Sequence, residues 1–201
     1  MATFVKHADE LTLFLFAEAI RRFTVDPGYA NKILQHLFAE KKGLKDGDRW
    51  SVSEMFYDFL RNKRLLESGM DFSGYKPIEK AYMLSTAYFA WRGVSVPKRL
   101  ELPRLNIDAF IKRLEANAAA NPAVAYSVPD WLYELGLAEL GDGWVRELEA
   151  LSSSPRQTLR VNTMKISTTD LIRRLEAHGF ECSAAPEVQN GIVMGRKVNL
   201  F

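Results

Sequence analysis

The sequence predicts a mainly α-helical protein that ends in a small α+β unit. Apolar residues recur at helical spacing through most of residues 8–117, where strand-like alternation is nearly absent. From residue 158 onward the pattern changes, because short alternating and apolar runs flank one capped helix. We therefore expect an all-α helical bundle at 1–117, a helical linker at 118–151 and a β-α-β-β unit at 152–201.

The bundle is predicted by a series of amphipathic stripes. The clearest begins at Val52, where apolar residues fall at i, i+3, i+4, i+7 and i+8. Another helix is expected to begin at Pro77, because the missing N–H of proline costs nothing in a first turn. Each stripe must be buried against another element, which favours a single bundle. The expected apolar stripes cover residues 13–23, 30–38, 52–60, 81–91 and 107–114.

Two short helices are expected in the linker. The small residues and the Asn-Pro pair at 116–122 indicate a connecting segment or a frayed helix end. Ser127 is a suitable N-cap residue, with Pro129 in the first turn and Asp130 at the third position, where its charge favours the helix dipole. A second helix is expected around residues 144–151.

The final unit is predicted from alternation and capping. Residues 158–163 alternate apolar and polar side chains, which indicates a half-buried strand. Ser167 is expected to cap a helix that ends at Gly179. Two further strands are expected at 180–184 and 191–194.

Composition limits the classes of function. Hydrophobic residues make up 47% and charged residues 26% of the chain, as in an ordinary globular protein. The net charge of +2 is too small to indicate nucleic-acid binding by itself. The single cysteine, Cys182, excludes an intrachain disulfide and a thiolate-rich metal site, and it fits a reducing, cytoplasmic setting. No signal peptide is expected, and the longest apolar run, 13–17, is far shorter than the roughly 20 residues of a membrane span.

Charge is unevenly distributed along the chain. Residues 1–125 carry a net charge of +4 and residues 126–201 a net charge of −2. Within the second part, residues 151–201 carry +3. The acidic excess therefore lies in the connecting helices around residues 130–149.

Two segments carry a resemblance to a known family. The run Leu159-Arg-Val-Asn-Thr-Met-Lys-Ile-Ser167 resembles the Leu-Arg-Val-Asn-Thr-x-Lys-x-Ser signature that precedes the catalytic core of the Fmu/Sun/RsmB family of RNA cytosine-5 methyltransferases. Ser127-Val-Pro-Asp-Trp-Leu132 resembles the family's earlier Pro-x-Trp-Leu segment. The preceding helices resemble, less specifically, the NusB-like domain of many bacterial members, through Tyr29-Ala30-Asn31, Asp48-Arg49 and Tyr57 with Leu60-Arg61.

The resemblance implies a longer enzyme that methylates RNA, ribosomal RNA in particular, with S-adenosylmethionine as cofactor. The family binds this cofactor with a Gly-rich turn after a strand and uses cysteines in Pro-Cys and Thr-Cys contexts, and neither feature occurs here. Methyl transfer to cytosine C5 needs a thiolate, and Cys182 lies in an expected strand without a basic neighbour to lower its pKa. We expect this chain alone to be inactive and to bind no S-adenosylmethionine, which belongs to the full-length parent.

Nine residues are candidates for RNA contact, whereas no catalytic or metal-binding residue is expected. Arg160 and Asn162 are expected to share one strand face, where they contact phosphates, brace the missing catalytic domain or are simply solvated. The basic clusters of the bundle are explained equally well as solvated helix ends. The candidates are Arg61, Lys63, Arg64, Lys98, Arg99, Arg156, Arg160, Asn162 and Lys165.

The expected function is the N-terminal RNA-recognition or accessory portion of a ribosomal RNA cytosine-5 methyltransferase. Two alternatives remain open: a protein-interaction helical module and a free-standing RNA-binding regulator. The expected partners are RNA, the missing catalytic domain and a protein partner of the bundle, and no membrane is expected.

Overall fold

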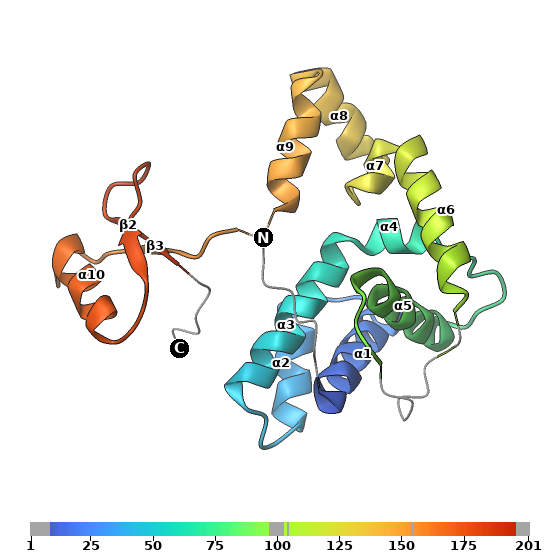
Figure 1. The fold of residues 1–201 in the computed structure, drawn as a ribbon, viewed down its shortest axis with the longest axis horizontal. Coiled ribbons are helices and arrows are strands. Elements are labelled where there is room, and N and C mark those ends of the chain that lie inside the picture. Colours follow the sequence, from blue (N-terminus) through green and yellow to red (C-terminus); the bar gives the residue numbers. More distant parts are fainter. Residues whose placement is uncertain (1–8, 97–102, 104, 154, 196–201) are drawn as a thin grey trace. The chain divides into compact units, whose positions relative to one another are not determined.

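The computed structural model describes residues 9–96, 103, 105–153 and 155–195 (Figure 1). These residues form ten helices and three strands. Contacts divide the chain into two compact units, Met1–Ser152 and Ser153–Phe201. The expected class, mainly α with a terminal β-α-β-β unit, is confirmed. The finer division of the first unit into bundle and linker stays a prediction.

The first unit contains nine helices among the described residues, and most of them lie where the apolar stripes indicated. One difference is at α6, which continues to Ala120 through the small residues that were expected to form a linker or frayed end. The helices are α1 (Glu10–Val25), α2 (Ala30–Glu40), α3 (Asp46–Arg61), α4 (Lys63–Ser68), α5 (Pro77–Arg92), α6 (Ile107–Ala120), α7 (Pro122–Ala125), α8 (Asp130–Leu140) and α9 (Gly143–Ser152).

Helix α1 forms the centre of the bundle core, where it packs against α3 and α5. Phe16 of α1 is fully buried. Its ring centroid lies 4.6 Å from that of Tyr88, 5.1 Å from that of Phe89 and 6.3 Å from that of Phe59. Burial of these large rings stabilises the bundle, because each removes a large apolar area from water.

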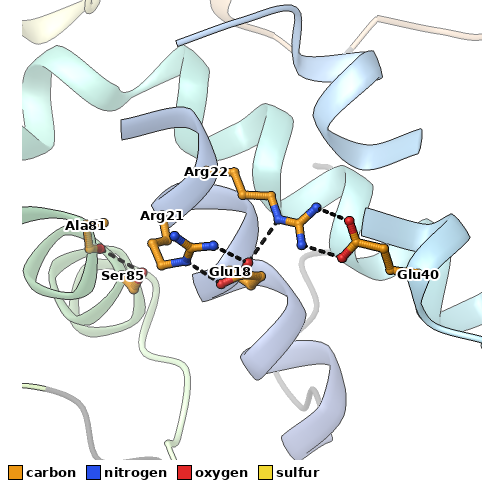
Figure 2. Close-up of polar contacts among 6 residues, drawn as sticks. All are labelled: Glu18, Arg21, Arg22, Glu40, Ala81 and Ser85. Carbon is orange, nitrogen blue, oxygen red and sulfur yellow. Dashed lines mark hydrogen bonds and ion pairs between the residues drawn. The ribbon is translucent and has the colours of Figure 1, made fainter. Parts of the chain in front are cut away.

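Polar contacts also join the helices of this bundle (Figure 2). Figure 2 shows Glu18 accepting hydrogen bonds from Arg21 and Arg22. The distance between Arg21 Nε and Glu18 Oε2 is 2.6 Å. Arg22 also donates two hydrogen bonds to Glu40, which links α1 to α2. Hydrogen bonds from Arg21 and then Arg22 hold the pKa of the Glu18 carboxyl below its ordinary value. In the same view Ser85, buried on α5, donates to the carbonyl oxygen of Ala81.

Helix α6 is held against the end of α4 by side chains that satisfy terminal carbonyl groups. Asn117 Nδ2 donates to the carbonyl oxygen of Ser68 at 2.6 Å, and Arg113 Nε donates to that of Gly69 at 3.0 Å. A Cβ on Gly69 would lie 2.7 Å from the Phe110 ring, so this position requires glycine. The residues expected to begin a linker therefore continue a helix that packs against the bundle.

The second unit is a three-stranded antiparallel sheet, with strand order β1-β3-β2, packed against one helix. The strands are β1 (Thr158–Arg160), β2 (Cys182–Ala184) and β3 (Gly191–Met194), and the helix is α10 (Thr168–Ala177). Ser167 caps α10 as expected, because its Oγ accepts a hydrogen bond from Asp170 N at 3.1 Å. Val161, Ile192 and Met194 form the core beneath α10, and Leu171 and Leu175 pack against them.

Candidate nucleic-acid interface

The face of the sheet opposite α10 carries polar side chains of β1 and β2 beside the apolar Val193 of the central strand β3. Leu159 pairs with Ile192, whose side chain is buried in the α10-side core. Because side chains alternate along a strand, Thr158 and Arg160 point to the other face. Ser183 of β2 lies on that face too, since it pairs with Val193 directly opposite Thr158. The exposed hydroxyl and guanidinium groups on either side of half-buried Val193 suit contacts with a phosphate backbone.

Three exposed cations lie along β1 and the turn that follows it. Arg156 precedes the strand, Arg160 ends it, and Lys165 lies in the turn. Within the part of the chain that the structure describes, none of the three forms an ion pair. Exposed cations without a carboxylate neighbour among these residues suit contact with an anionic partner.

The expected position of Asn162 on the strand face beside Arg160 is wrong. Strand β1 ends at Arg160, and Asn162 initiates a turn in which its Oδ1 accepts from Met164 N at 3.2 Å and its carbonyl oxygen accepts from Lys165 N at 2.9 Å. Asparagine favours such turns because its side chain satisfies a backbone donor two residues on. Asn162 thereby positions Lys165 and also Met164, a 96% exposed side chain that the sequence did not single out.

The three basic residues at the α3–α4 junction, Arg61, Lys63 and Arg64, lie in different environments. Arg61 ends α3 and is exposed. Lys63 Nζ lies 2.8 Å from Glu67 Oε2. Arg64 donates to the carbonyl oxygen of Val128, and its second guanidinium nitrogen lies 2.6 Å from Asp130 Oδ1. Lys63 and Arg64 therefore have partners within the first unit. The other two candidates of the first unit, Lys98 and Arg99, lie outside the described residues.

Ser127 is not the N-cap of α8, contrary to the sequence-based expectation. Pro129 holds that position, and it makes no side-chain capping bond. Ser127 instead accepts a hydrogen bond from Leu65 N at 2.9 Å, so it satisfies a backbone donor in the first turn of α4. Its φ of +57° belongs to the left-handed region, which ends the preceding turn before α8 begins.

Cys182 has the environment of a structural thiol. It is half-buried and packs against the core beneath α10. Burial raises the pKa of the Cys182 thiol above its ordinary value, and the Glu176 carboxylate raises it further. A thiol in this state is a weak nucleophile. The described residues also hold no group of three His, Cys, Asp or Glu side chains placed to bind a metal.

Comparison with known proteins identifies the class of the C-terminal part. Residues 128–200 match the model of the RsmF/B-like methyltransferase ferredoxin-like domain. The chain therefore carries an RsmF/RsmB-like ferredoxin-like domain, and the family resemblance seen in the sequence is confirmed for this range. No curated protein matches the chain.

A solved structure supports the fold of nearly the whole chain. The crystal structure of PH0851 matches 96% of this chain with a TM-score of 0.57 at 17% sequence identity. The match spans 50% of the PH0851 chain, so this chain covers half the length of that protein. At this identity the match shows the fold alone. The resemblance of the bundle to NusB-like domains stays a prediction.

In the described part of the chain, no helix has the length and apolar character that a membrane crossing requires.

Proposed function

We propose that this chain is the N-terminal RNA-recognition and accessory portion of an RNA cytosine-5 methyltransferase that acts on ribosomal RNA. The observation that carries the proposal is the RsmF/B-like ferredoxin-like domain with three cations that form no ion pair among the described residues: Arg156 before β1, Arg160 at its end and Lys165 in the following turn. In this proposal S-adenosylmethionine and the catalytic cysteines belong to a further domain of the full-length enzyme.

Electrostatics favour Arg156, Arg160 and Lys165, called the β1 cations from here on, over the α3–α4 cluster as the RNA contacts. A cation that already neighbours a carboxylate releases fewer counterions when it meets a phosphate, so it adds less affinity. Lys63 and Arg64 are in that state, since they pair with Glu67 and Asp130. The β1 cations also belong to a segment, residues 151–201, that is net positive.

The test is RNA binding as a function of salt. Fluorescence anisotropy with labelled ribosomal RNA hairpins would compare the wild-type chain with a variant carrying Arg156→Ala, Arg160→Ala and Lys165→Ala. We expect salt-dependent binding by the wild type. Each lost phosphate contact lowers the magnitude of the slope of log K against log salt by roughly 0.7–0.9, so the loss of three contacts should lower it by about 2–3.

The matched control is Arg173→Ala, which removes an exposed arginine of the same unit that pairs with Asp170 at 3.3 Å. This variant should retain the wild-type slope. Absence of salt-dependent RNA binding by the wild type would overturn the proposal. Equal losses in the triple variant and the control would overturn the assignment to β1.

A further inference from the structure

Helix α8 presents an apolar stripe that nothing in the described part of the chain buries. Trp131, Leu135 and Ala138 follow one another at i, i+4 and i+7, so they share a face of the helix. Trp131 is 65% and Leu135 50% exposed, and Ala138 is exposed as well. An amphipathic helix normally buries such a stripe.

Helix α8 is attached to the rest of the first unit at two points. Gly136 is buried against the indole of Trp144 on α9, so closely that a Cβ at Gly136 would lie only 2.2 Å from it. At about 100° per residue, Gly136 lies well around the helix from the stripe. Asp130, at the start of α8, is bound to Arg64 of α4. The α8–α9 hairpin is thus anchored at the start of α8 and where Gly136 meets Trp144, while Leu137 and Leu140 elsewhere on α8 are 45% and 52% exposed.

Acidic side chains border the stripe. Glu134 and Glu139, both exposed, lie on either side of it by helical spacing. Residues 130–152 contain six acidic side chains and one basic side chain, Arg146. A surface of this charge repels a phosphate backbone, and it equally repels a second copy of itself. The chemistry that complements it is apolar and positively charged.

We propose that the outer face of α8 is a docking surface for a basic amphipathic helix of a protein partner. Apolar side chains of the partner would cover Trp131 and Leu135, and flanking Lys or Arg residues would meet Glu134 and Glu139. Recognition of an amphipathic helix through apolar anchors at helical spacing is a common binding mode. This surface is distinct from the cations of β1, and the proposal does not depend on RNA binding.

The direct test uses the full chain and three synthetic peptides of equal length. The first is a helical Leu/Lys heptad peptide, the second replaces its Lys residues with Glu, and the third replaces its Leu residues with Ser. Isothermal titration should detect binding of the first peptide only. Trp131→Ala with Leu135→Ser should weaken that binding at least tenfold, and Glu134→Gln with Glu139→Gln should weaken it several-fold and flatten its salt dependence.

The matched control is Tyr29→Ala, which removes an 83% exposed aromatic ring outside α8 and should leave peptide binding unchanged. Binding that survives loss of Trp131 and Leu135 would overturn the proposal. So would acrylamide quenching that shows Trp131 shielded in the free chain, with Trp131→Phe as reference, because the face would then be covered already. A dimer that dissociates in the Trp131→Ala variant would assign the face to a second copy instead.

Discussion

Arg64 and Asp130 form an ion pair of 2.6 Å between α4 and the first residue of α8, although 66 positions separate them in the sequence. Arg64 also donates to the carbonyl oxygen of Val128, and Ser127 accepts from Leu65 N. The segment that opens the family-matched range is therefore bound to the N-terminal turn of α4. These contacts give Arg64 a structural role in the first unit.

Arg64→Ala should destabilise the first unit by about 1–2 kcal/mol, because it leaves the partly buried Val128 carbonyl without its donor. The exposed part of the ion pair contributes little, since solvent screens it. The measurement is the free energy of unfolding in urea. Arg61→Ala removes a neighbouring exposed arginine and should change stability by less than about 0.5 kcal/mol. Equal effects of the two substitutions would contradict the structural role of Arg64.

Gly136→Ala should open or distort the α8–α9 hairpin. The added methyl group would meet the Trp144 indole at 2.2 Å. Overpacking of about 3 kcal/mol exceeds the roughly 1 kcal/mol that alanine gains over glycine in a helix, so we expect a net loss of about 2 kcal/mol. Thermal unfolding and near-UV circular dichroism of the tryptophans would measure it. Gly143→Ala is the control, because its Cβ would enter open space.

Stability should fall with acidification in a way that depends on Glu18. Hydrogen bonds from Arg21 and Arg22 hold the pKa of Glu18 below its ordinary value of 4.5. A group whose pKa is depressed in the folded state contributes stability above its unfolded pKa, and that contribution is lost as pH falls through the folded pKa. Urea unfolding of wild type between pH 7 and pH 3 should therefore lose stability below about pH 4.5 more steeply than Glu18→Gln. Glu134→Gln, an exposed change on α8, should keep the wild-type slope, and a wild-type slope in Glu18→Gln would refute the argument.

Cys182 should react slowly with thiol reagents. Burial and the nearby Glu176 raise the pKa of its thiol, so the thiolate fraction at pH 8 is smaller than that of a free cysteine. The rate with Ellman's reagent should be lower than for glutathione, and its pH midpoint should be higher. Because the chain has one cysteine, the signal needs no assignment. Unfolding in urea should restore the free-cysteine rate, and a folded-state rate equal to that of glutathione would contradict the structure.

Much of the fold could be predicted from periodicity alone. The stripes that contain Phe16, Phe56 and Leu84 each repeat at helical spacing, and only burial in a common core satisfies all of them at once. The N-cap at Ser167 could equally be predicted, since its partner, Asp170, is three residues away. Such local signals succeed because the interacting groups are close in sequence.

The candidate site was only partly predictable. Arg156, Arg160 and Lys165 are exposed cations, as a polar strand face and turn suggest. Asn162 was misplaced because the alternation continues past Arg160, whereas the pairing with β3 ends there and a turn begins. Nothing in the local pattern marks the end of a strand when the residues beyond it still alternate.

By itself the sequence determined most of the helices, the approximate strands, the acidic character of the α8–α9 region and the family of residues 128–200. Only the tertiary structure decided that Ser127 accepts a hydrogen bond from α4, that Arg64 pairs with Asp130 and that Trp131 is exposed. The physical reason is the separation of the interacting residues along the sequence. Helix periodicity and capping depend on neighbours within a few residues, whereas the partners of Ser127 and Arg64 lie more than 60 positions away and are brought together only by packing.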